Sequence, residues 1–505
     1  MFFKKSLHMT LVFLVFFFFI SSSTEAEVYA ADRKASDKNK VRVWFSSEKD
    51  PASRTWYDGP LEVKYALDEQ TPLTWTKKKT SDSAAVYIDP SRRYQSVLGV
   101  GASLEESTIH NLSKMTPAKR KEVLKKLVDP KDGIGMDVMR ITIGTSDFTA
   151  QEFYTYDDMP EGQTDPKLRH FSIQKDIDLH ITATIKEALA INPELKIIAS
   201  PWSPPAWMKT NENLKRGKLK DKYIGALAVY FRKFIEAYEK QGIPIYAMTL
   251  QNEPLLEIDY PSMYMPPSQQ RKLAIAVKKE LKKHIIDTKI WIYDHNASGA
   301  WNYIPPILDD KKGNRAADGI AFHDYDGDLS VMSEIGKRYP DQSIHLTERS
   351  VWGTAGADRI AQYFRNGASS YNAWVTMLDS QIKTHHWIGT PDPTLFIQDA
   401  KNPDRYWNIP IFHMTGNFSK FIDRGAKRIE SNYGSKNTVS NVSFLNPDQS
   451  IVTVVINQTS SEQKFHVVSE NRQFEAVIPA KTVATYKWQR QKVKNRHIDV
   501  PASFC

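Results

Sequence analysis

The chain has 505 residues, 41% hydrophobic and 25% charged, with 12 Trp, 22 Tyr and 23 Phe; this allows about three domains and excludes a disordered chain. The formal net charge of +9 fits an anionic environment and a solvated basic surface equally well. The single cysteine, Cys505, excludes a disulfide framework, a cysteine-ligated metal site and thiol catalysis in the folded body.

The first 30 residues have the pattern of a secretory signal peptide. Two lysines precede an apolar run over residues 9–20, three serines follow it, and Val28-Tyr29-Ala30 loosely resembles a cleavage site. The run is shorter than the ~20 residues that span a bilayer. We therefore predict a signal peptide over residues 1–30 and a secreted, extracellular protein, with an uncleaved anchor as the alternative.

The next segment, residues 31–93, contains only short strand patterns, at 41–45, 61–65 and 85–89. So few strands do not form a stable core alone. We predict that they pair with strands from the other end of the chain.

Between residues 94 and 415, apolar runs typical of strands alternate with amphipathic stretches typical of helices. Residues 223–241, for example, repeat apolar side chains with a period of 3.6. This alternation indicates parallel βαβ units, and eight runs predict a closed (β/α)8 TIM barrel, hence an α/β fold. The predicted strands are 94–103, 137–144, 195–201, 245–253, 289–295, 318–325, 343–348 and 371–378.

The C-terminal part has no helical period. Residues 451–456, 465–468 and 483–488 are short runs rich in β-branched and aromatic residues. We predict that residues 416–488 form an all-β sandwich together with the N-terminal strands. Residues 489–505 form a basic tail.

Polar side chains follow several predicted strands, at the end of a barrel where active sites lie. Glu253 ends the predicted fourth strand and Glu348 ends the seventh. Two carboxylic side chains across an aromatic pocket suit glycoside hydrolysis, because one protonates the leaving oxygen and the other attacks or stabilises the anomeric carbon. The pattern alone leaves open that the two glutamates are unrelated turn residues.

Six segments carry a more specific signal. They are Leu98-Gly-Val-Gly-Ala102, Thr145-Ser-Asp-Phe148, residues 200–211, Gln251-Asn-Glu-Pro254, Thr347-Glu348 and residues 416–422. In this order they resemble the signature segments of glycoside hydrolase family 30, the family of glucosylceramidases and β-1,6-glucanases. The resemblance implies a (β/α)8 barrel with a β-sandwich built from both chain ends, and a retaining double displacement.

The resemblance also implies catalytic roles. Glu253 would be the general acid/base, with a raised pKa, and Glu348 the nucleophile, with a lowered pKa. Arg140 would support the charge of Glu348. Asn252 would bind the sugar 2-hydroxyl.

The remaining implied site residues bind substrate. Asp147, Trp202 and Trp374 match positions that hold the terminal glucose, and His323 and Tyr325 would flank the nucleophile. Neither a cofactor nor a metal is implied. We expect a β-glucoside substrate, either a glycolipid or a glucan, no nucleic acid, and contact with a membrane surface or cell wall as a possibility.

The substrate remains open between three readings. A secreted retaining β-glycosidase of glucosylceramidase type is the first, an endo-β-1,6-glucanase the second, and a noncatalytic carbohydrate-binding protein the third. Glucosylceramidases typically have Trp where this chain has Asp324, and Asp326 and Asp328 follow it, so the expected polar rim suits a soluble glycan at least as well as a ceramide. The same aspartates do not make a calcium loop, because Gly327 and Ile335 occupy the wrong positions.

Overall fold

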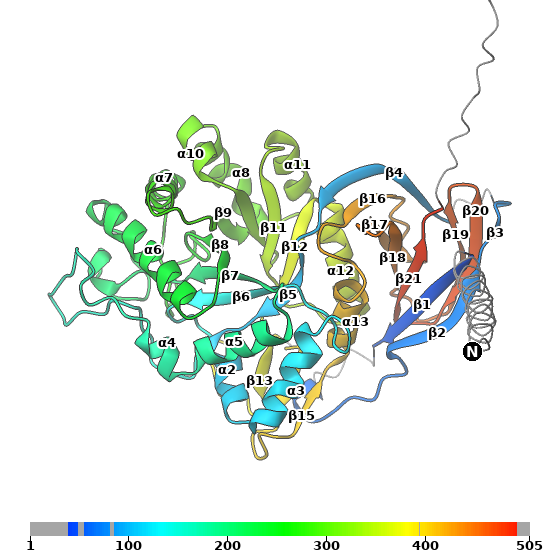
Figure 1. The fold of residues 1–505 in the computed structure, drawn as a ribbon, viewed down its shortest axis with the longest axis horizontal. Helices are drawn as coiled ribbons and strands as arrows, with labels where there is room; N and C mark the ends of the chain where they lie inside the picture. Colours follow the sequence, from blue (N-terminus) through cyan, green and yellow to red (C-terminus); the bar gives the residue numbers. More distant parts are fainter. Residues whose placement is uncertain (1–38, 49–54, 81–84, 393, 492–505) are drawn as a thin grey trace, which may run out of the picture.

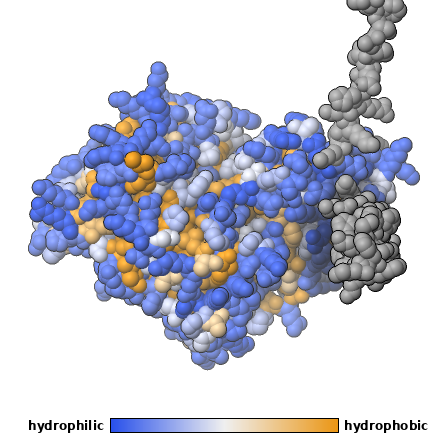
Figure 2. Space-filling view, viewed as in Figure 1, coloured by the Kyte–Doolittle hydropathy of each residue, from blue (hydrophilic) through white to orange (hydrophobic). Residues whose placement is uncertain are grey.

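The computed structural model describes residues 39–48, 55–80, 85–392 and 394–491, which form a barrel and a β-sandwich side by side (Figure 1). The predicted signal peptide lies outside these residues, as do positions 492–505 of the basic tail with Cys505. Within the described ranges, no helix is long and apolar enough to cross a membrane. Hydrophilic residues cover most of the face shown in Figure 2, and most of its exposed hydrophobic patches lie over the barrel.

The barrel has eight parallel strands in the order β10-β11-β12-β5-β6-β7-β8-β9, which confirms the predicted fold. Several strands are buried along their whole length, because helices cover the barrel outside and side chains fill it inside. This is why the sequence shows apolar runs instead of alternation. The strands are β5 (Gly99–Ser103), β6 (Val138–Ile143), β7 (Lys196–Pro201), β8 (Ile245–Thr249), β9 (Lys289–Asn296), β10 (Gly319–His323), β11 (Ser343–Glu348) and β12 (Ala368–Ala373).

The longer helices bury one apolar stripe each, as α6 does along the segment predicted from its period. Helices α12 and α13 lie between the barrel and the sandwich and contact strands of both (Figure 1). The helices are α2 (Glu106–Ser113), α3 (Pro117–Val128), α4 (Gln174–Asp178), α5 (Ile181–Ile191), α6 (Ile224–Lys240), α7 (Pro267–Lys283), α8 (Ala300–Tyr303), α9 (Pro305–Leu308), α10 (Lys311–Ala316), α11 (Ser330–Arg338), α12 (Gly353–Arg365) and α13 (Pro410–Ser419).

The sandwich interleaves strands from the two ends of the chain, in the order β2-β1-β21-β18-β17-β16-β4-β19-β20-β3. Strand β1 pairs with β21, and β4 pairs with β16 and β19, which confirms that the N-terminal strands join the C-terminal ones. The strands are β1 (Lys40–Ser47), β2 (Ala66–Thr74), β3 (Thr76–Lys77), β4 (Val86–Ser96), β16 (Lys427–Ser431), β17 (Ser440–Leu445), β18 (Ser450–Asn457), β19 (Gln463–Ser469), β20 (Arg472–Ile478) and β21 (Thr482–Gln489).

Several predicted strands were wrong in their extent; the fourth, predicted over 245–253, ends at Thr249. Residues 94–103 belong to two strands, because the chain passes from the sandwich to the barrel at Val97 and Leu98. The Val97 N–H donates to the carbonyl of Ala426, directly before sandwich strand β16, and the Leu98 N–H donates to the carbonyl of Ser369 in barrel strand β12. Residues 61–65 are irregular, and the strand begins at Ala66. Residues 371–378 also divide, because β13 (Met377–Asp379) leaves the barrel to pair with β14 (Phe396–Gln398), which in turn pairs with β15 (Tyr406–Asn408).

Helix α13 spans the position 415/416 at which the sequence suggested the start of the sandwich. The helix contacts β1, β2 and β21 on one side and β5 on the other, so it belongs to the seam between the two parts. The first C-terminal sandwich strand is β16, which begins at Lys427.

Candidate active site

The floor of the candidate site is a polar layer inside the barrel. Below it, an apolar layer is formed by Val138, Ile198, Ala247, Trp291 and Ala321, among others. Side chains two residues apart on a strand point to the same side. Two residues further along four of these strands the buried side chains are polar, and they are Arg140, Ser200, Thr249 and His323.

Two β-bulges shape this layer. In the pairing of β9 with β10, Tyr293 and His295 lie opposite the consecutive residues Ala321 and Phe322. Asp294 therefore has no partner in β10 and is the extra residue of the bulge. In the pairing of β10 with β11, Thr347 is the extra residue directly before Glu348. A bulge redirects the side chains that follow it, and here it brings two carboxylates to the same layer.

Arg140 connects the ends of β8 and β11, the two strands whose following or final glutamates the sequence singled out. Its guanidinium is buried, with Nη1 2.5 Å from Glu348 Oε2 and Nη2 2.8 Å from Asn252 Oδ1. The predicted contact between Arg140 and Glu348 is therefore present. Because the Asn252 carbonyl already accepts this bond, its amide nitrogen is left to donate toward the cavity that Asn252 lines.

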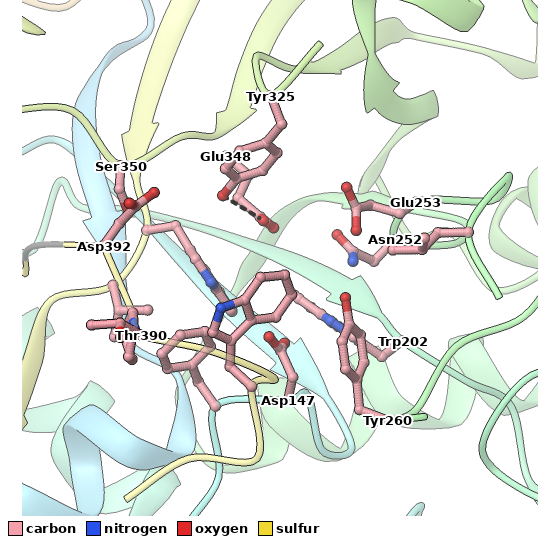
Figure 3. Close-up of a pocket in the computed structure, with 16 residues that line it drawn as sticks. Asp147, Trp202, Asn252, Glu253, Tyr260, Tyr325, Glu348, Ser350, Thr390 and Asp392 are labelled. Carbon is pink, nitrogen blue, oxygen red and sulfur yellow. Dashed lines mark hydrogen bonds between the residues drawn. The ribbon is translucent and has the colours of Figure 1, made fainter. Parts of the chain in front are cut away.

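The second oxygen of Glu348 is held by Tyr325. The Tyr325 hydroxyl donates to Glu348 Oε1 at 3.0 Å, as the dashed line in Figure 3 shows. Although 40% of the residue is exposed, burial around the hydroxyl and the nearby Glu348 charge raise the pKa of Tyr325, so the hydroxyl stays protonated and remains a donor. Both oxygens of Glu348 thus accept hydrogen bonds, which hold the side chain in one orientation beside the cavity.

Asp294 is a fully buried carboxylate to which the sequence analysis assigned no role. It accepts from Thr249 and Thr347 at 2.6 Å each and lies 3.2 Å from Arg140 and 3.1 Å from His323. Burial alone would raise the pKa of Asp294, but Arg140 and His323 outweigh it and lower this pKa. A carboxylate at the end of the fifth apolar run was the signal that could have revealed it.

Glu253 faces two imidazoles. Its backbone has a φ of 47°, and its Oε1 lies 3.4 Å from His323 Nδ1 and 3.7 Å from His295 Nδ1. Burial alone would raise the pKa of Glu253, but the two histidines hold it below its usual range. The predicted raised pKa is therefore wrong for the ligand-free site, because sequence reasoning did not place histidines against this carboxylate.

His323 carries the compensating proton. Burial opposes its charge, yet Glu348, Asp294 and Glu253 together raise the pKa of His323 to about 10. Its Nε2 lies 3.8 Å from Glu348 Oε2, so one imidazolium lies between both predicted catalytic carboxylates, consistent with its predicted place beside the nucleophile.

The raised pKa of His323 makes the free energy of unfolding depend on pH. The unfolded histidine titrates near 6.5, so its charge stabilises the fold fully below about pH 6.5, and this contribution is lost as pH rises through the folded pKa of about 10. We expect His323→Gln to unfold at a lower temperature than wild type at pH 6 and to lose less stability between pH 6.5 and 10. Calorimetry across this range measures it, with the exposed His170→Gln as control. Equal pH slopes for His323→Gln and wild type would contradict the assignment.

Above this layer opens a cavity of ≈ 370 Å³. Seven of the nine predicted site residues line this cavity. Arg140 and His323 do not line it, because they are buried in the polar layer beneath it. The Trp202 and Trp374 rings stack at 5.3 Å between centroids. The seven are Asp147, Trp202, Asn252, Glu253, Tyr325, Glu348 and Trp374, several of which are labelled in Figure 3.

Asp147 is buried on this wall. Burial, followed by the charges of Glu348 and Glu253, raises the pKa of Asp147 well above its usual range. A neutral carboxyl both donates and accepts, which suits a sugar hydroxyl. Further walls come from Leu256 and Tyr260 after β8 and from Trp387 and Asp392 after β12; these long loops carried no motif.

Asp324 does not form the expected polar rim. Its carboxylate accepts two bonds of 2.6 Å from Arg359 and one of 2.7 Å from Tyr363, so it is buried and satisfied. Across the described ranges, no group of three or more His, Cys, Asp or Glu could hold a metal ion.

Known proteins resemble both parts of the chain. The glycosyl hydrolase family 30 TIM-barrel domain matches residues 97–422, and the glycosyl hydrolase family 30 beta sandwich domain matches residues 425–486. An endo-1,6-beta-D-glucanase of Trichoderma harzianum is 30% identical over 442 residues, 82% of this chain and 87% of the relative. The lysosomal acid glucosylceramidase of Mus musculus is 26% identical over 445 residues, 82% and 85% of the two chains. A solved endo-beta1,6-glucanase structure has a TM-score of 0.80 and 26% identity, with 90% of this chain and 100% of that one covered.

Proposed function

Because the chain belongs to glycosyl hydrolase family 30, and is thus a glycoside hydrolase, we propose that it cleaves β-glucosidic bonds by a double displacement that retains the anomeric configuration. The observation that carries the proposal is the placement of Glu253 and Glu348 on one cavity in different surroundings. Glu348 is held by donors from Arg140 and Tyr325, whereas Glu253 faces two histidines. We assign Glu348 as the nucleophile because both of its oxygens are held by donors, and Glu253 as the acid/base because the protonated His323 lies beside it.

In the first step, a Glu348 oxygen attacks the anomeric carbon while a proton passes to the glycosidic oxygen. The bond to the leaving alcohol breaks and a glucosyl ester of Glu348 forms. In the second step, Glu253 takes a proton from water, which attacks the same carbon and releases glucose and the free Glu348 carboxylate. We assign the first proton to the Glu253–His323 pair, because in the ligand-free site His323 holds it 3.4 Å from Glu253.

Two substrates suit this mechanism. Exposed Trp387 and Ile388, on the cavity wall and beside it, favour the glucosylceramidase type, because an apolar rim suits a lipid. Asp326, Arg349 and Arg359, which line an adjoining cavity, favour an endo-β-1,6-glucanase. We also propose that the protein is exported, and this part of the proposal rests only on the sequence of residues 1–30.

One set of incubations tests this function. We expect wild type to hydrolyse 4-nitrophenyl β-D-glucoside with the β-anomer of glucose as the first product by NMR. Oligosaccharides from pustulan, a β-1,6-glucan, would identify the glucanase, and glucose from glucosylceramide in detergent the glucosylceramidase. The α-anomer as first product would contradict retention, and no hydrolysis of any substrate would favour the noncatalytic reading.

A further inference from the structure

A second cavity, of ≈ 450 Å³, lies between the loop after β10 and the start of α12. We call it the α12 pocket and define it by Asp326, Arg349, Trp352, Ala355 and Arg359. None of these residues belongs to the site described above.

The α12 pocket adjoins the catalytic cavity. Tyr325 and Ser350 line both cavities. The Tyr325 side chain, whose hydroxyl holds Glu348, therefore stands between them, and 40% of this residue is exposed. A ligand that extends from the reacting bond past Tyr325 enters the α12 pocket.

The charged groups of the pocket are largely compensated within the protein. Arg359 is fixed by its paired bonds to Asp324. Arg349 lies over the Tyr325 ring at 4.7 Å and 3.7 Å from an Asp392 carboxylate oxygen. With two arginines and two aspartates along its lining, the pocket shows no excess charge that would select an ion.

The lining instead combines donors, acceptors and rings. Asp326 is exposed and accepts hydrogen bonds, whereas Arg349 and Arg359 donate them. Trp352 is partly buried and packs at 6.4 Å against Trp56, which holds its ring in place. A sugar offers hydroxyls to the first set and C–H groups to the ring, whereas an acyl chain would cover the exposed Asp326 carboxylate without giving it a hydrogen bond.

The position of the pocket indicates which side of the scissile bond it serves. Asp147 and Trp202 follow β6 and β7, which lie across the barrel from β10 and β11. The α12 pocket lies at the β10 and β11 side. If the terminal glucose is held by Asp147 and Trp202, the leaving group points toward the α12 pocket.

We propose that the α12 pocket binds glucosyl units on the leaving-group side of a soluble, neutral β-glucan. This inference rests on the proposed β-glucosidase function and adds its substrate class. It predicts that a longer β-1,6-linked oligosaccharide is cleaved more efficiently than a short one, because only the longer chain reaches the pocket.

The test fills the pocket without altering the catalytic groups. Ala355 is exposed on α12 and lines the pocket, so Ala355→Phe occupies it. Ala118→Phe makes the same change at an exposed alanine of α3 and is the matched control. Asp326→Ala, which removes one exposed acceptor, is a second variant. The measured quantity is kcat/KM for gentiotetraose divided by that for 4-nitrophenyl β-D-glucoside.

We expect this ratio to fall by about tenfold or more in Ala355→Phe, to fall in Asp326→Ala, and to equal wild type in Ala118→Phe. Ratios equal to wild type in both pocket variants would overturn the α12 pocket as a binding site while leaving the β-glucosidase intact. A loss of both activities in parallel would also overturn it. A wild-type enzyme that hydrolyses neither the aryl glucoside nor pustulan nor glucosylceramide would instead remove the proposed function, and this inference with it.

Discussion

Replacing Glu348 by glycine is expected to lower kcat for 4-nitrophenyl β-D-glucoside by on the order of 10⁴-fold, about 5.5 kcal/mol in the activation barrier. Without the carboxylate no glucosyl ester forms, and Arg140 and Tyr325 lose the anion they hold. Steady-state assays measure this loss, and calorimetry establishes that the variant folds.

Azide identifies the missing group. It fits the space that the side chain leaves and attacks the anomeric carbon from the same face, so Glu348→Gly with azide should form α-glucosyl azide. Glu348→Gln, which keeps the volume and leaves no room for azide, is the control and should stay inactive. A residual kcat above about a tenth of wild type in Glu348→Gly would exclude Glu348 as the nucleophile.

Replacing Glu253 by glutamine should have an effect that depends on the leaving group. A general acid contributes about 10²- to 10⁴-fold, so kcat/KM for an alkyl β-glucoside should fall by roughly 10³. For 2,4-dinitrophenyl β-glucoside, which leaves without a proton, kcat/KM should fall by less than about tenfold. Azide should speed turnover of this substrate and yield β-glucosyl azide, because it enters the space that the departed dinitrophenolate leaves beside residue 253 and attacks the glucosyl ester from that side.

Glu257→Gln is the matched control for this experiment. Glu257 follows in the same loop and is exposed, and its carboxylate accepts a bond from the Gly217 N–H. It should retain wild-type rates on both substrates. Equal losses on the alkyl and dinitrophenyl glucosides in Glu253→Gln would show that this residue acts on binding or folding and not as the acid.

The sequence predicted the barrel and the wall of its cavity well, because both depend on local pattern. Fully buried strands produce apolar runs, and Glu253 and Glu348 follow two of these runs within motifs of the family. The pairing of the chain ends was also predictable, since the short strands at 41–45 and 85–89 had no other partners.

What pattern could not predict depends on register and on distant loops. The bulge that selects Asp294 is one extra residue in a strand pair, which the spacing of apolar residues does not show. The low pKa of Glu253 arises from His295 and His323, which belong to the following two strands. The sequence predicted Asp324 as a residue of a polar rim, because it does not show that Arg359 of helix α12 forms an ion pair with this carboxylate.

The interleaved sheet also affects how the protein folds. Strand β1 lies between β2 and β21, with Arg42 opposite Lys487, so this inner strand cannot complete its pairing until β21, which is far away in the sequence, has been synthesised. Such distant pairings form slowly, and until then β1 exposes an edge open to other chains. A chain that stops before β21 has a complete barrel sequence but leaves β1 and β18 without their shared neighbour.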